Sequence, residues 1–290
     1  MGYRYIFRPD VLSVERSAQN GPADDHDVYV FDDEEIVLAI NVALATARPL
    51  LVRGTPGSGK STLAPNVARV MRRSYLEMVV TSRTEPEDLL WSFDAVRRLS
   101  DAHQGQVEGA GSYYRPGVLW EAFESGGAGA VVLIDEIDKA DPDLPNSLLG
   151  PLGTHTFTVP DGRAVAAPKG AEPLVVITSN DERHLPRPFL RRCVVVTLPQ
   201  PTREHLLQVA RAHLGGAHDP GLSRALADTV LAARNQTVTA DGSAPSTAEF
   251  LDTLRACHRL GIDTTSPEWE QLADASLFKP ANRALERHAR

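Results

Sequence analysis

Residues 54–61 have the residue types and the spacing of a loop that binds phosphate groups. They read Gly-Thr-Pro-Gly-Ser-Gly-Lys-Ser and match the pattern G-x-x-x-x-G-K-S/T. Glycines allow backbone N–H groups to turn toward phosphate oxygens without a Cβ clash, and the dipole of a following helix adds to the attraction. Lys60 can neutralise the β- and γ-phosphates, and the Ser61 hydroxyl can bind Mg²⁺. The expected nucleotide-binding residues are Gly54, Thr55, Pro56, Gly57, Ser58, Gly59, Lys60, Ser61 and Thr62.

Two acids, Asp135 and Glu136, follow an apolar run at residues 131–134. Such a run predicts a buried strand, and open α/β sheets bind ligands at the carboxyl ends of their strands. We expect Asp135 to hold Mg²⁺ through its water shell, and Glu136 to polarise an attacking water molecule as a general base. The alternative is an ordinary strand with a solvated acidic turn, and the phosphate-binding loop upstream argues against it.

A second apolar run, residues 174–178, ends in Ser179 and Asn180, and an arginine pair follows at Arg191 and Arg192. The Asn180 amide can orient a water molecule near the γ-phosphate, although Ser-Asn also begins many turns. The arginine pair falls between a short predicted helix and a strand. It is either solvated or acts as an arginine finger that reaches the γ-phosphate of a neighbouring subunit.

The elements that must position these residues alternate along the first two thirds of the chain. Short apolar strands separated by helices predict a parallel sheet that is covered on both faces. Residues 97–115 show no regular pattern, and residues 154–170 predict a hairpin that turns at an Asp-Gly pair. The expected strands are 3–7, 50–52, 75–80, 131–134, 174–178 and 193–197, and the expected helices are 33–47, 59–72, 117–125 and 144–152.

The pattern changes at Pro199 and Pro201, which predict a domain boundary. Beyond them the chain shows helical spacing only, at 203–214, 222–233, 247–260 and 267–278. We therefore expect an N-terminal arm at 1–32, an α/β nucleotide-binding domain at 33–198 and an all-α domain at 199–290.

Composition excludes several classes of protein. The chain has 290 residues, of which 42% are hydrophobic, and a net charge of −8. No apolar run approaches the ~20 residues that span a bilayer, and the N-terminus has no signal-peptide core, so we expect a cytoplasmic protein without a membrane segment. The negative charge argues against a protein that coats nucleic acid. Two cysteines are too few for a disulfide framework, and no Cys/His spacing resembles a zinc site.

The order of these motifs resembles that of the AAA+ ATPases. The phosphate-binding loop is followed by the acid pair, Asn180, the arginine pair and a helical segment. Residues 39–44, 48–52, 133–140 and 146–149 are similar, more narrowly, to the MoxR-like branch. The resemblance covers residues 33 to 278 and implies a P-loop NTPase fold, which is a three-layer sandwich around a parallel sheet, with a C-terminal all-α lid.

The resemblance also implies roles for individual residues. Lys60 and Ser61 match the loop lysine and the Mg²⁺ ligand, and Asn180 matches the first sensor of the γ-phosphate. Asp135 and Glu136 match the acid pair. Arg192 best matches the finger that acts in trans, with Arg191 as the alternative. Members form homo-oligomeric rings, usually hexamers, with ATP and Mg²⁺ between protomers.

One position departs from the family pattern. The lid usually carries a second sensor arginine at the start of its third helix, where this chain has Ala248, and Arg255 lies two turns further on. The resemblance therefore does not predict phosphate sensing by this lid.

We expect Mg²⁺-dependent ATP hydrolysis at subunit interfaces, coupled to the remodelling or activation of a separate protein substrate or adaptor. One alternative is a nucleotide-gated scaffold with slow turnover. Another is a nucleic-acid-associated motor or a restriction-type GTPase subunit, against which the net charge argues.

Overall fold

The computed structural model describes residues 5–9, 28–237 and 245–277. These residues form two compact units. Within the described ranges, the first unit comprises 5–9, 33–54 and 60–198, and the second comprises 28–32, 55–59, 199–237 and 245–277. None of the described helices is long and apolar enough to cross a bilayer.

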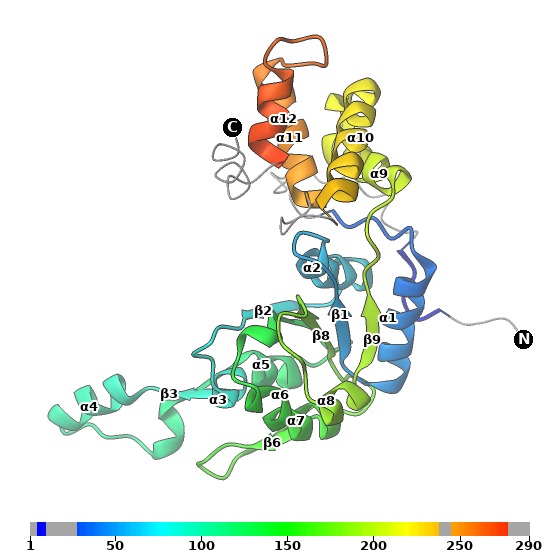
Figure 1. Ribbon diagram of the computed structural model, residues 1–290. Helices are drawn as coiled ribbons and strands as arrows, with labels where there is room; N and C mark the ends of the chain where they lie inside the picture. The colour runs from blue at the N-terminus through cyan, green and yellow to red at the C-terminus, as the bar shows by residue number, and fades with distance from the viewer. Residues whose placement is uncertain (1–4, 10–27, 238–244, 278–290) are drawn as a thin grey trace, which may run out of the picture. The chain divides into compact units, whose positions relative to one another are not determined.

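The first unit is built on a five-stranded sheet with the order β2-β5-β8-β1-β9 (Figure 1). All neighbouring strands are parallel, and the register pairs Val131 with Leu174 and Leu50 with both Val176 and Val194. The carboxyl ends of the strands therefore lie along one edge of the sheet. The strands are β1 (Leu50–Arg53), β2 (Tyr75–Val79), β5 (Val131–Asp135), β8 (Leu174–Ser179) and β9 (Val194–Thr197).

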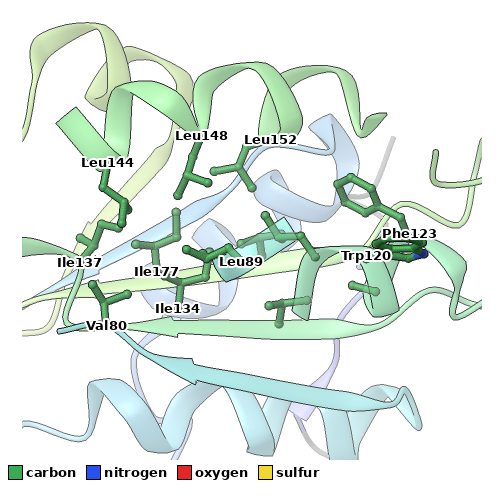
Figure 2. Packing of buried hydrophobic residues seen from close by; sticks show 14 of the residues in the cluster. Val80, Leu89, Trp120, Phe123, Ile134, Ile137, Leu144, Leu148, Leu152 and Ile177 are labelled. Carbon is green, nitrogen blue, oxygen red and sulfur yellow. The ribbon is translucent and has the colours of Figure 1, made fainter. Parts of the chain in front are cut away.

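Helices cover both faces of this sheet, which confirms the predicted three-layer fold. Successive strand residues point to opposite faces. On one face, Ile134 and Ile177 pack against the helices that carry Trp120, Leu148 and Leu152 (Figure 2). The other face is covered by helices that contact β5 and β9. The helices of the first face are α5 (Val118–Glu124), α6 (Asp143–Ser147) and α7 (Leu149–Thr154), and those of the second are α1 (Glu34–Thr46) and α2 (Lys60–Met71).

Local sequence signals explain several element boundaries. Asp33 caps α1, because its side chain accepts a hydrogen bond from the Glu35 N–H.

The predicted hairpin is confirmed as β6 (Thr156–Thr158) paired antiparallel with β7 (Ala164–Ala166). Both cysteines are buried free thiols, and burial raises the pKa of Cys193 to about 12.

The predicted helix 144–152 is instead two short helices that meet at Leu148. Pro151 explains the break, because it has no N–H to donate to the carbonyl of residue 147. The predicted strand at 3–7 is also wrong for the residues that the structure describes. The Ile6 and Phe7 N–H groups donate to the Asn41 side chain, at 2.7 and 2.9 Å, rather than to a neighbouring strand.

Residues 97–115 are more regular than predicted. They contain most of α4 (Ala95–His103), the 3₁₀ turn η3 (Ala110–Tyr113) and part of β4 (Tyr114–Pro116). The segment between β2 and α5 also includes α3 (Pro86–Leu90) and β3 (Trp91–Phe93), and β3 pairs antiparallel with β4. This segment extends away from the sheet (Figure 1). No residue of α4 is buried, so the helix lacks the buried apolar stripe that makes a helix readable from sequence.

The second unit is helical, as predicted. Its core includes Leu206, Leu226, Val230, Phe250 and Leu254. A capping box between Ser246 and Glu249 starts the third helix. The helices are α9 (Arg203–Leu214), α10 (Pro220–Thr237), α11 (Thr247–Leu260) and α12 (Trp269–Leu277).

Candidate active site

The phosphate-binding loop connects the end of β1 to the first residue of α2. Gly57 and Gly59 have φ values of +72° and +90°, which residues with a side chain rarely adopt. The first N–H groups of α2 have no carbonyl partner within the helix, so they can bind phosphate oxygens. This strand–loop–helix arrangement is the context that the sequence motif requires.

Lys60 is 6% exposed, and its Nζ donates a hydrogen bond to the Gly54 carbonyl at 2.9 Å. Loss of hydration lowers the pKa of Lys60, although nearby acids, of which Asp135 has the largest effect, oppose this shift. A bound phosphate would add an anionic partner to this buried cation.

Ser61 and Asp135 come together at the carboxyl edge of the sheet. Ser61 Oγ lies 2.9 Å from each carboxylate oxygen of Asp135, and the Thr178 hydroxyl also bonds to this carboxylate. Mg²⁺ is held by hard oxygen donors of this kind, with few protein ligands. The described residues contain no group of three or more His, Cys, Asp or Glu that could hold a metal ion. The hydroxyl–carboxylate pair supplies oxygen donors of the kind that Mg²⁺ prefers, so these two residues could hold the ion.

Glu136 and Asn180 meet beside this pair. The Asn180 amide donates to Glu136 Oε1 at 3.1 Å, and the Glu136 N–H donates to Thr178 Oγ1 at 2.9 Å. Glu136 adopts a left-handed backbone conformation, with φ +58° and ψ +47°. Such a conformation costs on the order of 1 kcal/mol for a residue with a side chain, and it occurs where the surrounding contacts enforce it. The base and the amide expected from sequence are thus adjacent.

Asp138 is a site residue that the sequence analysis missed. It is 2% exposed, and its carboxylate accepts hydrogen bonds from the N–H groups of Asn180, at 3.1 Å, and Glu182, at 3.0 Å. The 3₁₀ turn η4 (Ile137–Lys139) directs it back toward β8. The sequence signals were its spacing of three residues from Asp135 and its place in the stretch 133–140, and neither indicated that the side chain is buried.

Two ion pairs join Asp138 in holding the loop after β8. Lys139 Nζ lies 2.7 Å from Glu182, and Arg53 Nε lies 2.6 Å from Asp181. Both pairs are partly exposed, so each contributes little to stability. Together with Asp138 they tie the Asn180 loop to the ends of β1 and β5.

The arginine pair does not join this cluster. Arg191 and Arg192 end α8 (Arg187–Arg192), just before β9, whose first residue Val194 pairs with Leu50 at the start of β1. Since the strands are parallel, the arginine pair lies at the amino edge of the sheet, opposite Asp135 and Asn180.

Within the second unit, the phosphate-binding loop approaches the start of α11. A Cβ on Gly57 would lie 2.3 Å from the Ser246 Cβ and 3.8 Å from the Ala248 Cβ. The Ala248 side chain offers no group that could bind phosphate. The Arg255 guanidinium lies 3.3 Å from His213 Nδ1 and 3.4 Å from Asp252, so it has partners within this unit.

Comparisons with known proteins identify the family to which this fold belongs. The family model of the AAA domain (dynein-related subfamily) matches residues 49–208. The chain is 26% identical over 167 residues to the Lon protease of Heliobacterium modesticaldum, covering 56% of this chain and 19% of that protein. It is 27% identical over 173 residues to the Lon protease of Frankia alni, covering 57% and 18%. The chain thus spans about a fifth of the length of these relatives.

Among solved structures, the RuvB Holliday junction branch migration motor of Thermotoga maritima is similar with a TM-score of 0.50 and 13% identity, covering 83% of this chain and 67% of that one. Identity this low shows the shared fold alone. The family match covers the five-stranded sheet, the phosphate-binding loop, the acid pair, Asn180 and the arginine pair. The chain belongs to the AAA domain family, in its dynein-related subfamily.

Proposed function

We propose that this chain is a Mg²⁺-dependent ATPase of the MoxR-like branch that hydrolyses ATP between two copies of itself. One observation carries the proposal. Lys60, Ser61, Asp135, Glu136 and Asn180 lie at the carboxyl edge of the sheet, whereas the arginine pair lies at the amino edge. A protomer therefore holds most of a hydrolytic site but cannot bring its own Arg191 and Arg192 to that site.

The residues at the carboxyl edge divide the chemistry. Lys60 and the loop N–H groups bind the β- and γ-phosphates. Ser61 and Asp135 would hold Mg²⁺, which neutralises phosphate charge when bound. Glu136 and Asn180 orient a water molecule, whose oxygen bonds to the γ-phosphorus as the bond to the ADP oxygen breaks. Glu136 accepts the proton of that water.

The arginine pair supplies what the protomer lacks. An arginine that stabilises the transferring phosphoryl group is worth roughly 10³–10⁵ in rate in nucleotide hydrolases. Arg192, or Arg191 beside it, would reach the γ-phosphate held by the next subunit of a homo-oligomeric ring. Ring closure would then switch hydrolysis on, and we further propose that a separate protein substrate or adaptor is remodelled by the resulting motion.

The test is ATP turnover per protomer measured against protein concentration. We expect the rate to rise with concentration in the wild type, to collapse in Arg192→Ala, and to remain near wild type in Arg187→Ala, which changes an arginine at the other end of the same helix. A rate that is independent of concentration and survives Arg192→Ala would overturn the proposal.

A nucleotide-gated scaffold is the second candidate, favoured by Ala248 at the start of α11. A lid without a phosphate-binding side chain couples weakly to hydrolysis. Glu136→Gln separates the two functions, because a scaffold that responds to ATP binding retains its partner activity in this variant, whereas a motor loses it.

A further inference from the structure

Arg48, which lies two residues before β1, holds the end of the helix that carries the arginine pair. Its Nε donates to the Arg192 carbonyl at 3.0 Å, and its Nη2 donates to the carbonyls of Arg191 and Cys193, at 2.6 and 2.8 Å. The last carbonyls of a helix have no donor within the helix. Arg48 supplies that donor from the segment between α1 and β1, more than 140 residues away in sequence.

The guanidinium is suited to this role. It is planar and always charged, so one side chain can donate in a fixed fork to several successive carbonyls. Its positive charge also lies where the helix dipole favours a cation. Because all three acceptors are backbone atoms, Arg48 fixes the path of residues 191–193, and with it the directions in which both arginine side chains leave the helix.

The two arginine side chains differ in their surroundings. Arg192 Nη1 lies 3.3 Å from the Leu149 carbonyl, and a Cβ at Gly153 would lie 2.6 Å from that nitrogen. Gly153 therefore leaves the space in which Arg192 rests against α7. The Arg191 guanidinium has no hydrogen-bond or ion-pair partner among the residues that the structure describes.

A cavity of about 430 Å³ adjoins this cluster, lined by Arg48, His155, Phe189, Arg191 and Arg192, among others. It gives the arginine side chains room to move without displacing the backbone that Arg48 holds. The amino edge thus combines a fixed backbone with side chains that can extend.

We propose that Arg48 is a positioning residue, which fixes the backbone of Arg191–Cys193 so that the arginine pair meets the γ-phosphate bound by the neighbouring subunit. The inference rests on the proposed function, since it requires catalysis between subunits. Arg48 itself contacts no nucleotide in its own protomer, because it lies at the edge of the sheet opposite Lys60.

The first test compares Arg48→Ala, Arg48→Lys and Arg187→Ala at a protein concentration where wild-type turnover has reached its plateau. Because a misplacement of about 1 Å can cost 10²-fold in rate, we expect kcat to fall about 10²-fold in Arg48→Ala. Arg48→Lys should recover only part of it, since a compact ammonium lacks the planar fork with which the guanidinium reaches the three carbonyls. Arg187→Ala should match wild type.

The dissociation constant of a fluorescent ATP analogue, measured on the same proteins, should change less than twofold, because the phosphate-binding loop is intact. Melting temperature and sedimentation show whether each variant folds and assembles. If Arg48→Ala does not fold, the kcat of Arg48→Lys is compared with wild type instead. Wild-type kcat in a folded, assembled Arg48→Ala protein would overturn the inference. So would an equal loss of kcat and nucleotide affinity.

The second test mixes Arg48→Ala with Glu136→Gln protomers. The first variant keeps an intact carboxyl edge and the second an intact amino edge, so interfaces between them should hydrolyse ATP. Activity above the sum of the separate proteins supports the inference, and activity equal to the sum overturns it. Concentration-independent turnover by wild type would instead overturn the proposed function itself, so the two failures are distinguishable.

Discussion

The two edges of the central sheet are built in different ways. At the carboxyl edge, side chains from β5, β8 and α2 bond to one another, as in the contacts of Asp135 with Ser61 and of Glu136 with Asn180. At the amino edge, the arginine pair is held through its backbone by Arg48, and its side chains border a cavity. One edge is organised by contacts between side chains, whereas the other is organised by contacts of one side chain with backbone carbonyls. Under the proposed function, the second edge acts on a neighbouring subunit.

The substitution with the largest expected effect on turnover changes the amino edge alone. Arg192→Ala should lower turnover of the assembled protein by roughly 10³–10⁵ if Arg192 is the finger. Arg191→Ala, its neighbour, serves as the matched comparison and should lower turnover much less. Steady-state kcat of the two variants decides the assignment, and a larger loss in Arg191→Ala would reverse it.

Asp138 tests the carboxyl edge. Asp138→Ala leaves two N–H groups of the Asn180 loop without their acceptor and should lower kcat by about 10–10²-fold through misplacement of the amide. Asp138→Asn keeps an acceptor oxygen and should retain most of the activity. Nucleotide affinity should be unchanged in both, and a folded Asp138→Ala protein with normal kcat would show that the loop holds its position without this carboxylate.

Lys60→Met should separate function from stability at the carboxyl edge. Nucleotide binding should be lost, while the free energy of unfolding rises by about 1 kcal/mol, because a cation with little exposure is replaced by an apolar side chain. Burial lowers the pKa of Lys60. The buried lysine therefore destabilises the folded protein most at pH values where its side chain is charged in both the folded and the unfolded state. The gain should therefore shrink as pH rises through the lowered pKa toward 10.5, the ordinary value for lysine.

Thermal unfolding of Lys60→Met and wild type, without nucleotide, at several pH values measures this gain. A difference of about 1 kcal/mol corresponds to a shift of roughly 2–4 °C in a domain of this size. A gain that increased with pH would contradict the direction of the pKa shift.

The substitution with the smallest expected effect leaves both edges of the sheet unchanged. Asp33→Ala removes the N-cap of α1 and should cost about 1 kcal/mol of stability. Asp33→Asn, which keeps the accepting oxygen, should be close to wild type. Chemical denaturation gives the difference, and kcat at a temperature well below melting should be the same in all three proteins.

Much of the carboxyl edge could be predicted from sequence because its signals are local. A glycine-rich loop between a strand and a helix, and two acids after an apolar run, place Lys60 and Asp135 without knowledge of the partner strands. By contrast, α4 has no buried residue, so no apolar periodicity marks it.

The tertiary structure decided which distant segments meet. Asp138 contacts the Asn180 loop because β5 and β8 are neighbours, and Arg48 contacts the end of α8 because β1 and β9 are neighbours. Periodicity shows that a segment is a strand but carries no information about which strand lies beside it. The sequence by itself therefore determined the chemical groups and their local elements, and the order of the strands in the sheet determined the contacts that orient those groups.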